Sequence, residues 1–550
     1  MSLLHSRSTF VILVSLLALF SCHHHRAIAS RAHAAAVLLD TTNAAADSLA
    51  LLSFKSLLTD PSHTLSSWNE STPFCRWQGI ECGGRRHPDR VTALSLSSLN
   101  LAGAFPPSVA NLTFLKTLDL SNNQLDGQVP VELGRLSRLQ YLNLSHNSLR
   151  GSIPAALGRC LALETIALGY NQLEGEIPPD LANLSSLTYL NPSHNTLSGQ
   201  IPLSLGNLTS LRLLDLTRTQ LSGAIPSTLG RLSNLKFLYL TINNLSGTIP
   251  PSIWNLSSLV YLLVGGNERL TGRIPQDVGE TLPRLEALFM YQNQFYGPIP
   301  ASLANATRLS DIEINTNFFS GTIPPEIGSL QLLQKLLLYK NSLEVKEPDD
   351  WGFFTALTNC SNLQYLLLHN NKLSGLLPTS ISNLSVSIVF ITLGSNSLSG
   401  SVSEGIGNLV NLNLFSIGNN TLAGSLPASI GMLKNLQKLD FSYNNFTGEI
   451  PSTIGNLSRL LVLYLPSNEF SGNIPKTLGN LHQLQQLDLS YNKLSGMIPE
   501  DFNLAIVLLL LFSIVGLMCS KQFPAERMLI GDVIKELHVV REMLLGKKDV

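Results

Sequence analysis

The stretch LNLSHNSLRGSIP, residues 142–154, contains the pattern that decides the fold. It fits the string L-x-L-x-x-N-x-L-x-G-x-I-P at every letter, and close versions of the string recur along most of the chain. The place of its asparagine recurs seventeen times. Thirteen of the sixteen intervals are 24 residues, and the others are 26, 30 and 25. A fixed period of this kind predicts a solenoid of stacked units. The recurring place, which we call the asparagine position, is occupied by Leu99, Asn123, Asn147, Asn171, Asn195, Thr219, Asn243, Asn267, Asn293, Asn317, Asn341, Asn371, Asn396, Asn420, Asn444, Asn468 and Asn492.

Each letter of the string has a physical reason. Alternating leucines such as Leu142 and Leu144 point inward from a short strand, while the residues between them point outward. Asn147 stands where the chain turns, and its amide can pair with backbone groups that a buried turn would leave unpaired. Thr219 could do part of this work, whereas Leu99 could not. The glycine permits a backbone shape that other residues avoid, and the Ile-Pro step fixes an extended bend. Stacked units then share one elongated core.

The composition agrees with a single repeated unit. Of the 550 residues, 110 are leucine, 44% are hydrophobic and only 13% are charged. Lys plus Arg is 36 and Asp plus Glu is 37, so the chain lacks the positive excess of a nucleic-acid-binding protein. The apolar content excludes a disordered chain, and six cysteines are too few for a disulfide-dense miniprotein. The length alone suggests three or four domains, but the repeat predicts one long array instead.

The L-x-G-x-I-P half of the string, with the L-G-N-L segment that follows it at residues 205–208, resembles the plant extracellular subtype of leucine-rich repeats. The resemblance covers residues 47–499. It implies an α/β solenoid, a plant-type leucine-rich-repeat superhelix with a parallel concave β-sheet and a helical, disulfide-bonded N-terminal cap. On this basis residues 47–82 form the cap, and residues 83–499 form about 17 repeats.

The cysteines support an extracellular array. Cys75 and Cys82 have six residues between them in a chain predicted to enter an oxidising compartment, so we expect a disulfide. A metal site would need two further nearby ligands, and only His87 is available. Cys160 and Cys360 occupy equivalent points of two repeats 200 residues apart, so we expect two buried free thiols. No metal and no cofactor are expected.

The two ends of the chain have the composition of targeting segments. Residues 1–30 combine a basic residue, an apolar stretch and small residues, which predicts a secretory signal peptide, with an uncleaved anchor as the alternative. Residues 504–520 are apolar and lie at the short limit for a membrane span of roughly 17–25 residues, with a buried core helix as the alternative. The sequence thus predicts a single-pass plasma-membrane protein with an extracellular N-terminus and a short cytoplasmic tail, residues 521–550. Secretion to the apoplast is the alternative.

Thirteen N-x-S/T sequons agree with secretion. Many lie twelve residues before an asparagine position, where L-G-N-L-S/T is also simply part of the repeat, and both interpretations can hold. The predicted glycosylated residues are Asn69, Asn111, Asn143, Asn183, Asn207, Asn244, Asn255, Asn305, Asn359, Asn383, Asn419, Asn445 and Asn456.

A solenoid binds with the outward residues of its concave strands. In the early repeats these positions carry small polar residues. In the middle repeats they carry a row of aromatic residues beside opposite charges, which is typical of a protein-binding surface, although solenoids also carry Tyr and Phe without a ligand. The sequence predicts that a peptide or protein ligand binds at Phe237, Tyr239, Tyr261, Phe289, Tyr291, Asp311, Glu313, Lys335, Tyr339, Tyr365 and His369.

The interval between Asn341 and Asn371 is six residues longer than the usual one and lacks the Gly and Ile-Pro steps. We expect its acidic bulge, residues 344–350, and Trp351 to lie at the rim of the aromatic row. Its D-W-x-F-x-x-x-L-T-N-C-S stretch is similar to one found in a subfamily of plant leucine-rich-repeat receptor kinases. That subfamily includes the receptors for bacterial flagellin and elongation factor Tu and a rice blight-resistance receptor. The resemblance implies immune perception of a microbial peptide or protein.

The end of the chain is similar to the last part of that subfamily's kinase domains. Within residues 512–545, Cys519, Pro524, Arg527, Met528 and Val533 fit a C-x-x-x-x-P-x-x-R-M-x-x-x-x-V pattern, and Leu537 follows after three intervening residues. The chain carries no G-x-G-x-x-G, H-R-D or D-F-G motif and no other catalytic constellation. We therefore expect a protein that is not an enzyme: a kinase-less, receptor-like surface protein that signals through or modulates a partner such as a co-receptor kinase. The alternatives are a secreted wall protein that inhibits microbial enzymes, and the truncated product of a receptor kinase gene.

Overall fold

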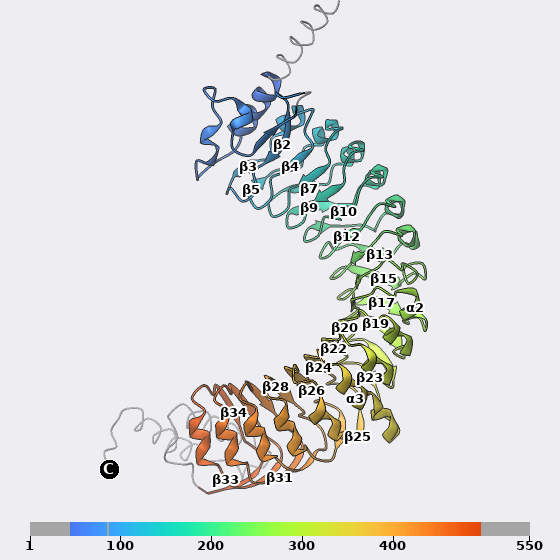
Figure 1. Ribbon diagram of the computed structural model, residues 1–550, viewed down its shortest axis with the longest axis vertical. Coiled ribbons are helices and arrows are strands. Elements are labelled where there is room, and N and C mark those ends of the chain that lie inside the picture. Colours follow the sequence, from blue (N-terminus) through green and yellow to red (C-terminus); the bar gives the residue numbers. More distant parts are fainter. Residues whose placement is uncertain (1–44, 85–86, 497–550) are drawn as a thin grey trace, which may run out of the picture. The chain divides into compact units, whose positions relative to one another are not determined.

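The computed structural model describes residues 45–84 and 87–496, which are coloured in Figure 1. These residues belong to two compact units that divide between Leu213 and Leu214. The predicted signal peptide (1–30), apolar segment (504–520) and tail (521–550) lie outside the described residues. Within the described ranges, no helix combines the length and the apolar character needed to cross a membrane.

The first unit begins with the cap. Residues 45–56 are helical, and the predicted disulfide between Cys75 and Cys82 is confirmed. The buried Asp47 carboxylate accepts hydrogen bonds from Arg90 Nε at 2.9 Å and from the Val91 N–H at 2.9 Å, which ties the cap helix to the first strand of the array. Removing one partner of such a buried pair is costly, because the other charge stays buried. The remaining cap elements are η1 (Thr64–Ser67), η2 (Phe74–Arg76) and β1 (Ile80–Cys82).

Each repeat of the first unit makes one coil with three sides. A short strand carries the alternating leucines, a second strand follows the asparagine position, and a 3-10 helix returns the chain to the next coil. The first strands pair in parallel, and they are β2 (Val91–Ser95), β4 (Thr117–Asp119), β6 (Tyr141–Asn143), β8 (Thr165–Ala167) and β10 (Tyr189–Asn191). The second strands are β3 (Ala102–Ala104), β5 (Gln124–Asp126), β7 (Arg150–Ser152), β9 (Gln172–Gly175) and β11 (Thr196–Leu197). The 3-10 helices are η3 (Pro107–Asn111), η4 (Val131–Arg135), η5 (Ala155–Arg159), η6 (Pro179–Asn183) and η7 (Leu203–Asn207).

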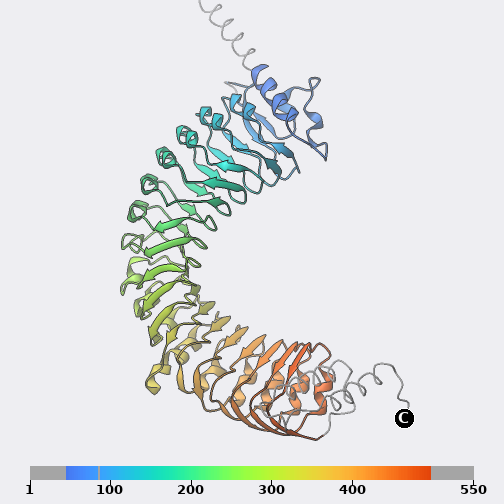
Figure 2. The ribbon, with the colours of Figure 1, turned by 180° about the vertical axis from the view of Figure 1, so that it is seen from behind.

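The second unit repeats the same coil. Strand β12 (Leu213–Asp215) stands at the division between the units. The leucine strands that follow are β14 (Phe237–Tyr239), β16 (Tyr261–Leu263), β18 (Ala287–Phe289), β20 (Asp311–Glu313), β22 (Lys335–Leu337), β24 (Tyr365–Leu367), β26 (Phe390–Thr392), β28 (Leu414–Ser416), β30 (Lys438–Asp440), β32 (Val462–Tyr464) and β34 (Gln486–Asp488). Within this unit they line the inner side of the curve, and α2 and α3 lie on the outer side (Figures 1 and 2).

The second strands of this unit form its flank. They are β13 (Ser222–Ala224), β15 (Asn244–Thr248), β17 (Arg269–Gly272), β19 (Gln294–Gly297), β21 (Phe318–Gly321), β23 (Ser342–Leu343), β25 (Ser374–Leu376), β27 (Ser397–Ser399), β29 (Ala423–Ser425), β31 (Asn445–Gly448), β33 (Glu469–Asn473) and β35 (Lys493–Ser495). The helices are η8 (Ser227–Arg231), α2 (Val278–Thr281), η9 (Ala301–Asn305), η10 (Pro325–Ser329), η11 (Pro348–Trp351), α3 (Gly352–Ala356), η12 (Leu357–Asn359), η13 (Thr379–Asn383), η14 (Glu404–Asn408), η15 (Ala428–Met432), η16 (Ser452–Asn456) and η17 (Lys476–Asn480).

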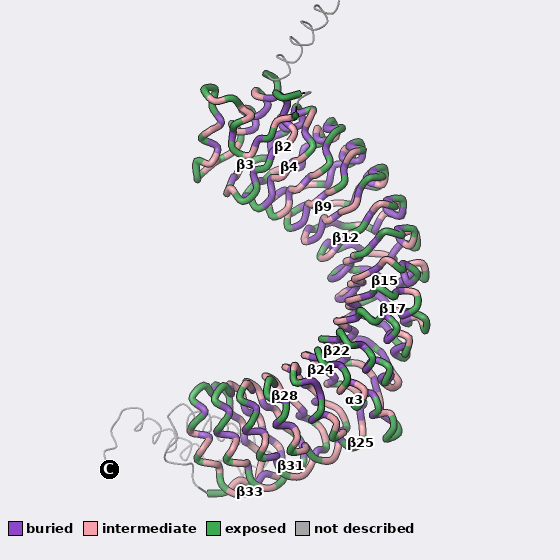
Figure 3. Tube along the Cα trace, in the orientation of Figure 1, coloured by how far each residue is buried: buried purple, intermediate pink, exposed green. Residues whose placement is uncertain are grey.

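The leucines fill the interior of each coil, and the asparagines close its turns. Inward residues such as Leu142 and Leu144 are fully buried, and the alternation of buried and exposed positions is visible in Figure 3. The Asn171 amide shows the role of the asparagine position. Its Nδ2 donates to the carbonyl oxygens of Leu144 and Leu168 at 3.0 Å, and its Oδ1 accepts from the Leu149 N–H at 3.0 Å. The predicted pairing with turn backbone is therefore confirmed, and each asparagine joins two successive repeats.

The turn needs a left-handed backbone immediately before the asparagine position. His146 and Tyr170, for example, have φ of 55° and 57°. In three described repeats the residue after the position is left-handed too: Asn100 after a leucine, Gln220 after a threonine, and Glu268 at the start of the 26-residue interval. Residues with a Cβ rarely adopt the left-handed conformation. The second left-handed residue gives these three turns a backbone shape that differs from that of the other turns.

The two remaining described cysteines are buried free thiols, as predicted. The Cys160 thiol donates to the carbonyl oxygen of Leu133 at 3.2 Å, and the Cys360 thiol donates to that of Gly328 at 3.6 Å. Burial raises the pKa of both thiols to about 11. Both therefore remain protonated and act as small core residues.

Candidate ligand-binding surface

The eleven residues predicted to bind a ligand lie on the inner side of the second unit. They belong to strands β14 to β24 or stand two residues after one of these strands, and all are half-buried. Parallel pairing places Phe237 beside Tyr261, and Asp311 beside Lys335. The surface is therefore continuous from strand to strand. We call it the aromatic–charged face, and it comprises Phe237, Tyr239, Tyr261, Phe289, Tyr291, Asp311, Glu313, Lys335, Tyr339, Tyr365 and His369.

Ring contacts hold the two ends of this face in place. Near β14, the rings of Phe237 and Tyr261 meet edge to face with centroids 5.3 Å apart. Near β24, Tyr339 stacks on His369 at 4.4 Å, and Tyr365 stacks on Phe390 at 5.1 Å. Sequence reasoning missed Phe390, which occupies the same outward position one repeat later. Rings that pack on one another lose little further freedom when a ligand covers them.

The centre of the face carries one ammonium group and two carboxylates. Lys335 Nζ lies 3.1 Å from Asp311 and 3.7 Å from Glu313. Burial raises the pKa of Glu313, although the nearby ammonium opposes it. Burial acts to lower the pKa of Lys335, but its hydrogen bond to Asp311 and the two negative charges outweigh it and raise that pKa. With one cation and two anions, the centre has a net negative charge at neutral pH.

The ring of Tyr291 depends on a glycine in the preceding repeat. A Cβ added to Gly265 would lie 2.5 Å from Cε1 of Tyr291, closer than side-chain carbons approach one another. The ring therefore lies across the backbone of that repeat. Burial, and then the charge of Glu313, raise the pKa of the Tyr291 phenol. The signal in the sequence is a glycine two residues before Asn267, where neighbouring repeats carry a side chain.

A depression of about 300 Å³ adjoins the face next to His369. The His369 Nδ1 lies 2.6 Å from the Thr392 hydroxyl, and burial, with a contribution from the charge of Lys340, lowers the His369 pKa to about 4. The imidazole is therefore neutral near neutral pH. Its lining includes Gly394 and Gly418, which occupy the positions equivalent to His369 in the next two repeats.

The expectation that Trp351 borders the aromatic row is wrong. Its side chain is buried, its Nε1 donates to the carbonyl oxygen of Ser374 on the flank strand β25 at 3.2 Å, and its ring packs on Phe353 and Phe354. The indole fills the space that the missing Ile-Pro step leaves in the core. In the acidic bulge, the Asp350 carboxylate accepts from the backbone N–H groups of Lys346 and Glu347, so it caps a local turn.

Twelve of the thirteen sequon asparagines are exposed, and many stand at the ends of the 3-10 helices, away from the inner strands. Asn143 differs from the others. It is half-buried on β6 of the first unit, and its amide oxygen accepts from both the N–H and the hydroxyl of Ser145. Glycans at the ends of the 3-10 helices would leave the aromatic–charged face open, whereas the exposed Asn419 lines the depression next to His369.

The sequence matches known families over much of its length. The leucine-rich repeat region family matches residues 93–235 and 374–501, and the leucine rich repeat N-terminal domain matches residues 44–83. Further leucine rich repeat matches cover residues 209–268 and 362–384.

Solved structures similar to this fold include plant leucine-rich-repeat receptors. The ectodomain of the Arabidopsis receptor kinase HAESA, in complex with an IDA peptide hormone, is 30% identical with a TM-score of 0.64, over 84% of this chain and 87% of that one. The plant peptide hormone receptor RGFR1, in complex with RGF2, is 32% identical with a TM-score of 0.64, over 79% and 78%. The fold therefore matches that of plant leucine-rich-repeat receptor ectodomains. The chain belongs to the leucine-rich-repeat family.

Curated relatives match over shorter segments. A segment of 85 residues is 49% identical to the receptor kinase-like protein Xa21 of rice (Oryza sativa subsp. japonica), covering 16% of this chain and 8% of that protein. A segment of 152 residues is 31% identical to receptor-like protein 39 of Arabidopsis thaliana, covering 28% and 16%. The matched segments thus span less than a fifth of either relative.

Proposed function

We propose that the chain is a receptor-like cell-surface protein of immune perception, and that a microbial peptide or protein binds to its aromatic–charged face. The observation that carries the proposal is the row of half-buried aromatic residues on parallel strands with a charged group at its centre. Large, preorganised rings of this kind carry much of the energy in protein interfaces. The peptide hormones bound by HAESA and RGFR1 support a peptide ligand, and the D-W-x-F-x-x-x-L-T-N-C-S stretch at residues 350–361 is the basis of the immune role.

The geometry suits an extended segment that crosses the strands. Apolar side chains of the ligand would contact the rings near β14 and β24, and a basic group would meet the net negative centre formed by Asp311, Glu313 and Lys335. Desolvated charges of this kind favour one partner over others more than they raise affinity.

The test is a binding screen of the purified protein against peptides from microbial surface and secreted proteins, followed by Tyr291→Ala and Tyr339→Ala on any ligand found. We expect each change to weaken binding about 30-fold, the effect of losing roughly 2 kcal/mol at a hot spot. Tyr296→Ala is the matched control, because this tyrosine is exposed on the flank strand β19. Binding that survives both changes at full strength would remove the site from the proposal.

We further propose that residues 504–520 hold the protein in the plasma membrane and that it signals through, or modulates, a partner such as a co-receptor kinase. A C-terminal fluorescent fusion tests the first part: protection of the tag from added protease supports a span, and release of the protein into the medium contradicts it. Amplification of the full transcript tests the second, since an intervening kinase exon would make this chain part of a receptor kinase.

A further inference from the structure

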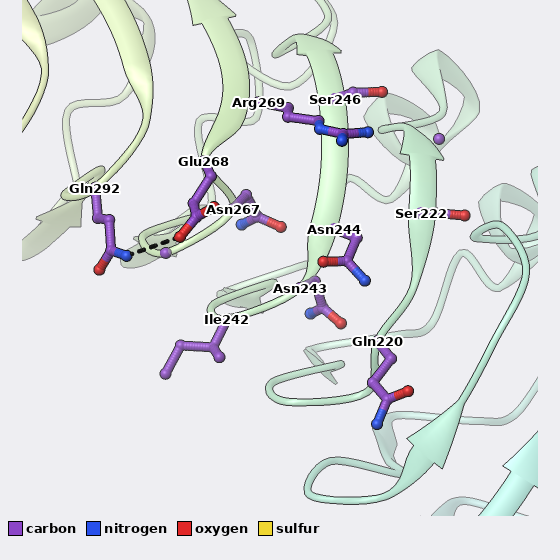
Figure 4. A pocket seen from close by; sticks show the side chains of 12 residues that line it. Gln220, Ser222, Ile242, Asn243, Asn244, Ser246, Asn267, Glu268, Arg269 and Gln292 are labelled. Carbon is purple, nitrogen blue, oxygen red and sulfur yellow. Dashed lines mark hydrogen bonds between the residues drawn. The ribbon is translucent and has the colours of Figure 1, made fainter.

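A polar trough of about 820 Å³ lies on the flank of the second unit, apart from the strands of the aromatic–charged face. It crosses β13, β15 and β17, and the exposed Asn244 lies near its middle. Figure 4 shows this side chain between Ser222 and Gln220 on one side and Glu268 and Arg269 on the other. The volume is within the usual range of ligand-binding pockets.

The trough exists because a regular repeat lies between two irregular ones. The left-handed Gln220 follows Thr219 on one side, and the left-handed Glu268 follows Asn267 on the other. The second irregular repeat also carries one extra residue before its buried leucine. For this reason Ser246 of β15 pairs with Arg269, the residue before that leucine. The turns on both sides are thus shaped differently from the turn between them, which leaves a hollow over the first half of β15.

The lining has the chemistry that sugar hydroxyls need. It offers the side chains of Ser246 and Arg269, and the carboxylate of Glu268, which already accepts a hydrogen bond from Gln292 Nε2 at 3.1 Å. Donors and acceptors are mixed, and much of the exposed lining is polar. A protein hot spot would instead present buried aromatic residues.

Asn244 is also the acceptor of a sequon, Asn-Leu-Ser, whose hydroxyl belongs to Ser246. The two residues are two positions apart on a strand, so both side chains lie on the same face, and both line the trough. The intervening Leu245 points into the core and is fully buried. An oligosaccharide attached to Asn244 would therefore begin within the trough.

We propose that Asn244 carries an N-linked oligosaccharide whose first sugars fill this trough, so that the glycan is a packed part of the flank. In the linkage step, Asn244 Nδ2 forms a bond to C1 of the reducing-end sugar. The bond from C1 to the lipid pyrophosphate of the donor breaks, the lipid pyrophosphate leaves with the electron pair, and a base of the transferase takes the amide proton. This role is separate from ligand binding on the aromatic–charged face.

The chain offers a matched control. Asn445 of the sequon Asn-Phe-Thr occupies the same place in its own repeat, is exposed, and lies outside the trough. The full chain, produced in plant cells and purified, is treated with peptide N-glycosidase before and after denaturation, and release at each site is followed by mass spectrometry. We expect release of the glycan at Asn244 to be about tenfold slower in the native protein than in the denatured one. This factor corresponds to about 1.4 kcal/mol of free energy that holds the glycan in the trough. Release at Asn445 should occur at similar rates in both.

Variants distinguish a glycan that packs in the trough from one that is only attached to Asn244. Arg269→Ala should speed native release at Asn244 and leave Asn445 unchanged. Asn244→Gln, or Ser246→Ala if the first variant is poorly produced, should lower the Tm more than Asn445→Gln does and leave ligand binding unaltered. An unoccupied Asn244, or a native release rate equal to that of Asn445, overturns the proposal. The ligand screen fails or succeeds independently of either result.

Discussion

The substitutions Asn123→Leu and Asn171→Leu make the same chemical change at the same place in two repeats of the first unit. They differ in the number of buried backbone groups that each leaves unpaired, because Leu99 stands at the asparagine position one repeat before Asn123. The pair therefore tests how the ladder of asparagines stabilises the array, with one variant as the control of the other.

For Asn171→Leu, the hydrogen-bond partners predict the loss of one group. The three carbonyl oxygens that accept from its Nδ2 each keep a second donor. These donors are Asn147 Nδ2 for Leu144, Asn195 Nδ2 for Leu168, and the His146 N–H for Gly169. The N–H of the buried Leu149 loses its acceptor. One unsatisfied buried donor costs about 1–3 kcal/mol of the free energy of unfolding.

For Asn123→Leu, two fully buried residues lose their partners. The Leu96 carbonyl oxygen accepts from Asn123 Nδ2 at 2.7 Å, and the Leu101 N–H donates to Asn123 Oδ1 at 2.9 Å. The Leu99 N–H also donates to this oxygen, but that residue is half-buried, so water can replace the bond. The expected cost is about twice that of Asn171→Leu, or about 2–6 kcal/mol.

Urea unfolding followed by tryptophan fluorescence measures the difference, because Trp68 and Trp77 lie in the same unit. Repeat arrays depart from two-state unfolding, so both the midpoint and the slope must be compared. We expect the lower midpoint for Asn123→Leu. An equal loss of stability in the two variants, or a larger loss for Asn171→Leu, would refute the argument that the number of unpaired buried groups sets the loss.

Three further predictions follow from the sites. Since the folded pKa of His369 is lowered to about 4, the native state loses stability as the pH falls from about 6.5 toward 4, and His369→Gln should flatten the pH dependence of the Tm in this window. Cys160 and Cys360, with pKa values of about 11, should resist iodoacetamide at pH 8 until the chain is unfolded, as mass spectrometry would show; rapid labelling of the native protein would contradict their burial. Gly265→Ala should displace the Tyr291 ring and weaken ligand binding as much as Tyr291→Ala, with an unchanged circular dichroism spectrum.

The sequence was informative where one residue type meets one physical demand in every repeat. Alternating leucines such as Leu142 must point inward, and an amide such as that of Asn147 must close each turn. The cap contains a closely spaced cysteine pair, Cys75 and Cys82, so its disulfide could also be predicted from the sequence. The outward positions of the middle strands followed in the same way, because a strand alternates its faces.

Sequence reasoning failed where the outcome depended on the neighbouring coil. Trp351 looked like a surface residue because its repeat lacks the usual steps, yet that missing step left a space that the indole fills. Sequence reasoning did not single out Gly265, which leaves space for the ring of Tyr291 from the next repeat. The trough around Asn244 arises from an extra residue one repeat later. The repeat pattern alone does not show where a neighbouring coil leaves a space or which side chain fills it.

The sharing of each asparagine between two coils also limits how such a gene can change. A whole coil can be duplicated or lost, because each turn would still have an asparagine in the next coil to pair with its backbone N–H and C=O groups. An insertion beside the ladder disturbs it: one extra residue follows Asn267, and Asn293 Oδ1 in the next coil is buried without a hydrogen-bond partner. The extra length of the 30-residue interval is accordingly found in η11 and α3, on the opposite side of the coil. The array can therefore change in length by whole coils, while its inner strands stay in register.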